Sequence, residues 1–387
     1  MLSTPGALRL FASAVVGRAP QGMSSLAILL LVRETTHSYA AAGLAVGVNA
    51  LASAASAPVV GQLIDKFGRS RVLVPFAAVQ AGCFVALVLA AAGGAGAAVL
   101  IGLSALAGWF LPPIAPVVRA LLREVFEASA TLDTAYALDA IFQELVWIGG
   151  PLVVALVIEA TSASVAVVMQ GAVVVLGTSL FVRSPLVRGA APAAALHSRG
   201  SAIASPGLRA LLAPVLLMGV GLGAIEVGLP SLALHDGSRG ASGLLLALWS
   251  LGSISGGLLY GARVWGSPLA ERYRVLLLAL LILTLPLIAA RSLAAGIVCA
   301  WLAGLAIAPV FSCQYALAGR SVKTGSETEA FTWMSAALIG GLAAGSAAGG
   351  AVIGPAGVSA PFVLSCVATM LAATVALSAR ARIAQTD

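Results

Sequence analysis

The sequence predicts an all-α membrane protein with twelve transmembrane helices arranged in two six-helix halves. The 387-residue chain is 60% hydrophobic and only 9% charged, whereas a soluble domain carries roughly 25% charged residues. Long apolar runs recur along the whole chain, and the cations gather in alternate breaks between them. The composition therefore excludes a soluble enzyme, a disordered chain and a nucleic-acid-binding module.

Twelve apolar segments are long enough to cross a bilayer, and short polar breaks separate them. The predicted spans are 6–32, 41–62, 72–93, 97–118, 134–158, 165–183, 209–234, 242–262, 274–291, 293–318, 330–354 and 358–379. We expect the first to be a span rather than a cleaved signal peptide, because it has no strong basic start and no small-residue cleavage site follows it.

The distribution of cations predicts the orientation of the spans. With the N-terminus in the cytoplasm, seventeen Lys and Arg residues fall on the cytoplasmic side, and only Arg33, Arg239 and Arg291 fall outside. Cytoplasmic loops of membrane proteins carry such an excess, so we expect both termini to be cytoplasmic. The same excess accounts for the net charge of +7, which in a soluble protein would indicate nucleic-acid binding.

The longest polar break lies between the sixth and seventh spans and is rich in Pro, Gly, Ser and Ala. This composition is typical of a linker. We predict a first half over residues 1–183, a cytoplasmic linker over 184–208 and a second half over 209–387. Two weak internal repeats at an offset of 200 residues agree with this division into halves. They are Ala42-Gly43-Leu44 with Ser242-Gly243-Leu244, and Val59-Val60-Gly61 with Leu259-Tyr260-Gly261.

The break after the second span carries the most specific motif, Gly61-Gln62-Leu63-Ile64-Asp65-Lys66-Phe67-Gly68-Arg69-Ser70-Arg71. It resembles the signature loop of the major facilitator superfamily, Gly-x-x-x-Asp-(Arg/Lys)-x-Gly-Arg-(Arg/Lys)-(Arg/Lys). The matching residues are Gly61, Asp65, Lys66, Gly68, Arg69 and Arg71, while Ser70 departs from a position that is usually basic. The resemblance implies the major facilitator fold, and it implies that the six matching residues form a conformational latch that stabilises the outward-facing state.

The residue types in this predicted loop also have physical reasons of their own. Gly61 lets another helix approach closely, and Gly68 permits a tight reversal. Asp65 can accept from helix N-terminal N–H groups or from a cation such as Arg69. A plain basic loop that only sets topology is the alternative. In the second half Trp265 stands where the acid would be, so we expect only one strong latch.

Glycine patterns indicate further helix contacts. Gly149-Gly150-Pro151 in span five resembles the core of the antiporter signature of drug/proton exchangers, although several positions that often hold Gly are Val or Ala here. We expect a helix kink at Gly150 and Pro151. Glycine rows in spans eight and eleven allow close helix contact. The resemblance implies that these spans meet between the halves, so we expect moving contacts there, with rigid packing inside one bundle as the alternative. These rows are Gly252, Gly256, Gly257, Gly261, and Gly340, Gly341, Gly345, Gly349.

Polar and charged side chains at membrane depth are candidate transport residues, because charge in the hydrocarbon core is costly. The candidates for substrate contact or proton coupling are Arg18, Gln21, Glu144, Glu226, Asp139, Trp109, Gln314 and Tyr315. The resemblance implies that spans one, four, seven and ten line a central cavity, which would place Arg18 and Glu226 on the path. As coupling acid we rank Glu226 first and Glu144 second.

Structural alternatives stay open for these charges. Arg18 and Glu144 can instead form a static ion pair that holds helices together. Glu226 can lie close enough to periplasmic water to need no partner. Asp139 can be a residue near a helix start that interacts with the helix dipole.

These features predict a secondary active transporter that exports amphipathic small organic compounds by proton antiport. The alternative is a symporter that imports a small polar nutrient with protons, but Asn49 is the only Asn, which argues against a sugar site. We expect no metal site, because the Cys and His residues are scattered. We expect no enzyme activity, because no Walker loop, His cluster or catalytic Ser/His arrangement appears, and no nucleic-acid partner, because there is no basic patch interleaved with aromatic residues. No cofactor is expected. The expected partners are substrate, protons and the lipid bilayer of a bacterial cell (inner) membrane, with the chain acting as a monomer.

The predicted topology can be tested by cysteine-accessibility labelling on a Cys-free background. Ser198→Cys should be labelled from the cytoplasm, and Ser238→Cys from the periplasm, because the cation distribution places their loops on opposite sides. The opposite sidedness at either position would contradict the twelve-span orientation.

Overall fold

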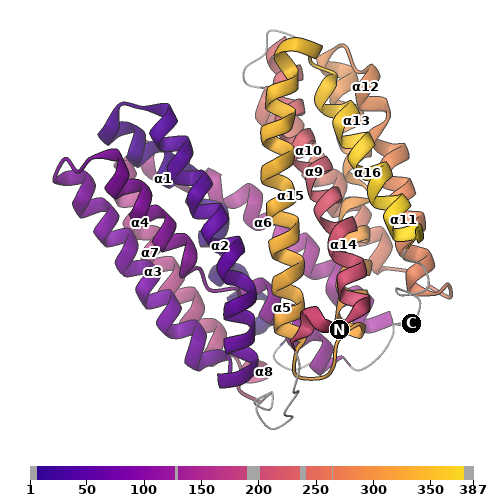
Figure 1. The fold of residues 1–387 in the computed structure, drawn as a ribbon, viewed down its shortest axis with the longest axis horizontal. Helices are drawn as coiled ribbons and strands as arrows, with labels where there is room; N and C mark the ends of the chain where they lie inside the picture. Colours follow the sequence, from indigo (N-terminus) through magenta and orange to yellow (C-terminus); the bar gives the residue numbers. More distant parts are fainter. Residues whose placement is uncertain (1–6, 127–129, 190–200, 236–240, 264, 379–387) are drawn as a thin grey trace. The chain divides into compact units, whose positions relative to one another are not determined.

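The computed structural model describes residues 7–126, 130–189, 201–235, 241–263 and 265–378. All regular structure in this part of the chain is helical (Figure 1). The earlier helices are α1 (Ala7–Thr36), α2 (Tyr39–Phe67), α3 (Arg69–Ala92), α4 (Ala97–Trp109), α5 (Ile114–Val125), α6 (Ala130–Ala160), α7 (Ala163–Arg183) and α8 (Pro185–Gly189). The later ones are η2 (Ala202–Ala204), α9 (Pro206–His235), α10 (Ala241–Gly261), α11 (Leu269–Thr284), α12 (Pro286–Ala289), α13 (Leu293–Gly304), α14 (Ile307–Arg320), α15 (Glu327–Ala356) and α16 (Ala360–Ser378).

Among the described residues, twelve helical stretches are long and apolar enough to cross a membrane, which confirms the predicted number of spans. Their orientation stays a prediction, and Ser198 and Ser238 lie outside the described residues. The same is true of residues 190–200 of the predicted linker, whose described parts include α8 and η2.

Spans four and ten, which correspond in the two halves, are each broken into two helical segments. α4 ends at Trp109 and α5 begins at Ile114, while α13 ends at Gly304 and α14 begins at Ile307. Both second segments begin with the same four residues, Ile-Ala-Pro-Val, at 114–117 and 307–310. This short repeat, at an offset close to that of the two predicted repeats, marks both breaks in the sequence.

The contacts divide the chain into two compact units. The first contains residues 1–125, 145–199 and 324–332, and the second contains 126–144, 200–323 and 333–387. The start of α6 therefore belongs to the second unit, and the start of α15 to the first. A division of the sequence at the 184–208 linker stays a prediction.

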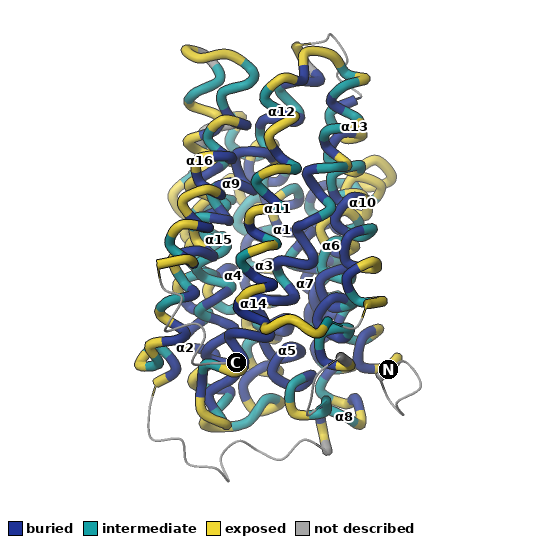
Figure 2. Tube along the Cα trace, turned by 90° about the vertical axis from the view of Figure 1, so that its right-hand side faces the viewer, coloured by how far each residue is buried: buried dark blue, intermediate teal, exposed yellow. Residues whose placement is uncertain are grey.

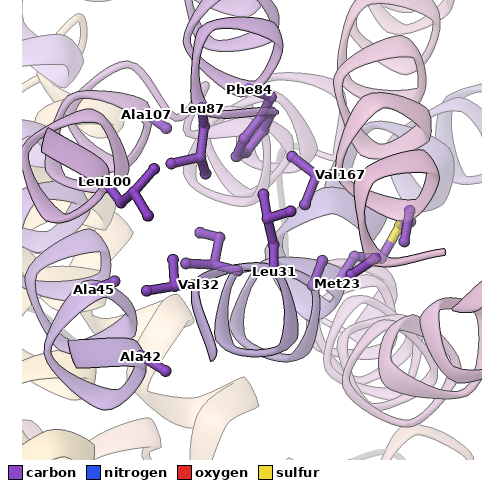
Figure 3. Close-up of a cluster of buried hydrophobic side chains, with 14 of the residues drawn as sticks. Met23, Leu31, Val32, Ala42, Ala45, Phe84, Leu87, Leu100, Ala107 and Val167 are labelled. Carbon is purple, nitrogen blue, oxygen red and sulfur yellow. The ribbon is translucent and has the colours of Figure 1, made fainter. Parts of the chain in front are cut away.

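The first unit has a core of buried apolar side chains from six helices, α1, α2, α3, α4, α6 and α7 (Figure 3). In this unit α1 lies along α7 and α2 lies along α4 (Figure 1). Leu31, Phe84 and Leu100 are at most 3% exposed, and Ala42 and Ala45 bring α2 close to them. Because lipid is as apolar as Leu, close packing rather than exclusion of water holds such helices together.

Large apolar side chains are exposed along the outer faces of the spans, where Figure 2 marks alternating buried and exposed positions. Leu156 in α6 and Leu259 in α10 are 62% and 71% exposed. In a soluble protein such residues would form an adhesive surface, but in a membrane protein they face the acyl chains of the lipid.

Glycines bring neighbouring backbones into contact inside the first unit. A Cβ placed on Gly22 of α1 would collide with the Val146 carbonyl of α6, and one on Gly150 would collide with Gly22. Gly108 of α4 lies in the same way against the Asn49 carbonyl of α2. α6 continues through Pro151 as one helix, so the predicted kink at Gly150 and Pro151 does not interrupt it.

The second unit repeats this arrangement. Gly341 and Gly345 of α15 lie against the backbone of α9, which corresponds to the contact of α6 with α1 in the first unit. Gly304 of α13 lies against the Trp249 carbonyl of α10, which corresponds to the contact of α4 with α2. Most of the predicted glycine rows therefore serve packing inside one unit rather than moving contacts. Gly340 has open space around it, and only Gly257 and Gly261 face α6.

Candidate functional site: two helix junctions and the membrane-depth charges

The signature motif joins two helices almost directly, rather than forming the loop that the sequence predicts. α2 continues to Phe67, and α3 begins at Arg69. Gly68 alone separates them, with φ of +92°, and its N–H donates to the Ile64 carbonyl at 2.8 Å. Residues with a Cβ rarely adopt this φ, so glycine is what allows the helix to extend this far before the chain reverses.

Asp65, on the last turns of α2, binds the N-terminus of α15. Its Oδ2 accepts from the backbone N–H of Glu329 at 2.9 Å, and the Thr328 hydroxyl forms a second hydrogen bond to its side chain. Gln62, one turn earlier, donates from Nε2 to Glu329 Oε1 at 3.0 Å. Of the two partners that the sequence allowed for Asp65, the helix N-terminus is the one in direct contact, where the macrodipole favours a carboxylate.

Gly61 makes this contact possible. A Cβ at Gly61 would lie 2.5 Å from Thr332 Oγ1 and 2.9 Å from the Glu329 Cα atom. Any larger residue would push α15 away and separate Asp65 from the Glu329 N–H. The glycine and the acid of the motif therefore act together.

The cations of the motif have separate partners. Arg69 forms an ion pair with Glu124 near the end of α5, and its side chain is 11% exposed. Lys66 Nζ lies 5.2 Å from the centre of the Phe67 ring, while Arg71 is exposed. Arg69 thus ties α3 to α5 rather than neutralising Asp65 by direct contact.

A second polar junction, which the motif did not predict, lies at the end of α10 in the second unit. Arg272 Nη1 of α11 donates to Asp133 Oδ2 of α6 at 2.8 Å and to the Tyr260 hydroxyl at 3.0 Å. Thr134 Oγ1 donates to the Gly261 carbonyl at 2.9 Å. The expectation of one strong latch rested on the missing acid at Trp265, but here the acid comes from α6 and the cation from α11. Its sequence signal is an acid in the first turn of span five and an Arg in the first turn of span nine.

The membrane-depth charges occupy different environments. Arg18 in the first unit is 3% exposed and Gln21 is half-buried. In the second unit Asp139 is fully buried. α6 begins at Ala130 and its first-turn acid is Asp133, so the interpretation of Asp139 as a helix-start residue is wrong.

Glu144 and Glu226 also differ within the second unit. Glu144 of α6 accepts from Ser253 Oγ of α10 at 3.0 Å, and Ser253 is fully buried. Glu226 on α9 is exposed. Because Arg18 belongs to the first unit, its pairing with either acid stays a prediction.

The three predicted wall residues are not equally accessible. Trp109, at the end of α4, is 41% exposed. Gln314 is 1% exposed and donates to the Tyr273 hydroxyl at 3.1 Å. Tyr315 is 4% exposed and stacks on Phe311, with ring centres 5.8 Å apart. Gln314 and Tyr315 thus have partners in the packing of the second unit, and their contact with substrate stays a prediction.

Twelve candidate spans in the described part of the chain, with polar helix junctions at their ends, indicate a multi-pass membrane protein. A family model described as Major Facilitator Superfamily matches residues 10–266. The match covers more than half of the chain, and the chain belongs to this family.

Solved structures of similar fold agree with this assignment. The human organic anion transporter MFSD10 (TETRAN) gives a TM-score of 0.76 at 15% identity, over 97% of this chain and 100% of that one. A bacterial homologue of the iron transporter ferroportin, in an outward-facing state, gives 0.77 at 16% identity, over 97% and 99%. At these identities the likeness shows the fold alone. No curated protein sequence matches the chain.

Asp65→Asn tests the first junction. Asn keeps an acceptor for the Glu329 N–H but loses the charge that interacts with the α15 N-terminus, about 0.5–1 kcal/mol. We expect normal insertion and a two- to fivefold slower substrate turnover in reconstituted vesicles. Glu159→Gln, the loss of an acid at an exposed position outside the motif, is the control. Wild-type turnover for Asp65→Asn would contradict the latch.

A double-mutant cycle tests the second junction. Asp133→Asn and Arg272→Gln should each lower the thermal unfolding temperature, because each leaves a largely buried partner unpaired. The double variant should lose less than the sum of the singles, with a coupling energy of about 1–3 kcal/mol. Arg274→Gln, whose Nε only reaches the Ala270 carbonyl in its own helix at 3.1 Å, is the matched control. Additive single effects would show that the pair contributes nothing.

Proposed function

We propose that the chain exports amphipathic small organic compounds in exchange for protons, by alternating access. The observation that carries the proposal is the environment of Glu144. This acid lies near the middle of a span that covers Thr131–Ala160, and hydroxyl groups of α10 surround its carboxyl group. A carboxyl group placed there by a transporter is a candidate for proton exchange.

Hydroxyl partners suit a group that gains and loses a proton. A serine hydroxyl donates to a carboxylate, and it can turn to accept from a protonated carboxyl group. Ser253 and Ser250 can therefore serve both states of Glu144. Within the described part of the second unit, no cation pairs with Glu144, in contrast to Asp133, which Arg272 holds.

Glu226 is the second candidate for this role. The sequence ranks it first because it is the sole acid of its span, and it is exposed on α9. Its exposure supports access to water or substrate, whereas the hydrogen bond from Ser253 to the half-buried Glu144 supports control of the proton by the protein. We propose Glu144 as the coupling acid and keep Glu226 as the alternative that a transport experiment separates.

The choice of an amphipathic substrate and of export rests on the sequence. The chain has a single Asn, and its amide Nδ2 donates to the Ser104 carbonyl at 2.8 Å. A hydrogen-bonding site rich in amides, which a sugar importer would need, has little support. We further propose that the protein works as a monomer in a bacterial inner membrane.

Everted membrane vesicles test direction and coupling together. In vesicles made acidic inside, an exporter driven by proton antiport accumulates ethidium, and Glu144→Gln should reduce this accumulation at least tenfold. Glu159→Gln, an exposed acid near the end of the same helix, is the control. Loss in Glu226→Gln but not in Glu144→Gln would move the coupling role to Glu226. Full accumulation in both variants would contradict acid coupling, and uptake driven only by the opposite gradient would favour the importer.

A further inference from the structure

The break in span four leaves a row of backbone acceptors without helical donors inside a candidate membrane span. α4 ends at Trp109, and Pro112 and Pro113 precede α5. In a helix the Trp109 carbonyl would accept from the N–H three or four residues later, and both of those residues are proline, which has none. The double proline therefore leaves this carbonyl without a local donor.

Neighbouring carbonyls show which groups the protein satisfies. Leu111 N–H donates to the Gly108 carbonyl at 3.1 Å, and Ile114 N–H donates to the Pro112 carbonyl at 2.9 Å. The Ala107 carbonyl accepts from Nε2 of Gln80, a buried residue of α3, at 3.0 Å. In the described part of the chain, no backbone N–H outside the regular helices donates to the carbonyls between these, which belong to Trp109, Phe110 and Leu111.

The position of the break decides what can satisfy these oxygens. Span four covers Ala97–Val125, so thirteen residues of α4, roughly 20 Å of helix, lie between its start and the break. A backbone group without a partner is not stable against lipid at this depth, and irregular backbone occurs only where protein covers it or water reaches it. Because no backbone N–H satisfies these carbonyls, a polar path along the break would give them the partners that they lack.

The corresponding break in span ten is different, and the difference supports this assignment. It contains no proline between Gly304 and Ile307, and the Leu305 carbonyl lies directly against Gly256 of α10. Protein covers that break. The Leu305 carbonyl also receives no backbone N–H in the described part of the chain, since Pro309 stands four residues after it. The two breaks therefore differ in how closely protein packs on them, and not in whether breaking the helix leaves a carbonyl without a donor.

All the groups at the break attract positive charge or hydrogen-bond donors. Three carbonyl oxygens are acceptors only, and the C-terminus of α4 carries the negative end of its dipole. The Trp109 ring, 41% exposed, adds a face that binds cations. Arg119, the first cation along α5, is 4% exposed and does not present its charge to solvent there.

We propose that the Trp109–Leu111 carbonyls and the Trp109 ring form a subsite for a protonated amine on the transported compound. The inference rests on the proposed function and names its substrate class: amphipathic compounds that carry an ammonium group with N–H donors. It excludes recognition of a carboxylate at this position.

The test is equilibrium binding to the purified full chain in lipid nanodiscs, without a pH gradient. The probes are phenethylammonium, its N-trimethyl derivative, which keeps the charge but has no N–H, and 3-phenylpropionate. We expect the ammonium to bind at least tenfold more tightly than the trimethyl compound, and the carboxylate to bind most weakly.

Two proline variants form a matched pair. Pro113→Ala supplies an N–H four residues after Trp109, so it should satisfy that carbonyl and reduce the ammonium preference about tenfold. Pro116→Ala, within the first turn of α5, should leave the preference unchanged. Trp109→Leu should weaken binding of both cationic probes threefold or more, and it provides a second measurement if Pro113→Ala does not fold.

Three outcomes would overturn the inference: no measurable binding of the ammonium, equal binding of the three probes, or an unchanged preference in folded Pro113→Ala. These outcomes are separate from those for the proposed function. Ammonium preference without gradient-driven export would leave the subsite standing and reject proton antiport. Gradient-driven export without ammonium preference would support proton antiport and reject the subsite.

Discussion

The structure depends on one constraint, that a backbone N–H or C=O group inside a bilayer must find a partner in the protein or in a wet path. Amide side chains of the first unit serve this need. They donate to carbonyls of neighbouring helices at 2.8–3.2 Å, in the pairs Asn49 with Ser104, Gln80 with Ala107 and Gln170 with Pro20. These amides would look like substrate ligands in the sequence, but they are bound to backbone.

The same constraint explains how much the sequence could predict. Continuous helices satisfy their own backbone, so twelve spans follow from apolar length alone. Glycine spacing also predicts that helices approach closely, but it does not name the partner. A glycine row allows close approach of any neighbouring helix. Gly345, for example, contacts α9 inside the second unit. The break in span four was hidden because its apolar pattern continues through Pro112 and Pro113.

The two junctions show why an internal repeat can keep a contact and change its chemistry. At the end of α2 the acid is Asp65, and its partner is a backbone N–H at the start of α15. At the end of α10 the acid is Asp133 from the start of α6, and Arg272 is its partner. Matching the motif along the sequence finds only the first, since the second distributes its residues over three helices. The pairing of Asp133 with Arg272, which lie far apart in the sequence, can be recognised only once the positions of their helices are known.

The acids of this protein differ in what their partners permit. A guanidinium group donates and never accepts, and Arg272 donates to Asp133 Oδ2 at 2.8 Å, so the pair ties α11 to α6. A backbone N–H at a helix start also only donates, but it moves with its helix. The hydrogen bond from the Glu329 N–H to Asp65 therefore depends on where the start of α15 lies. A hydroxyl donates and accepts, and the partners of Glu144 are hydroxyls. Partner chemistry therefore distinguishes Glu144 from Asp65 and Asp133, because its hydroxyl partners can serve a protonated carboxyl group as well as a carboxylate, and this difference is the reason for proposing it as the coupling acid.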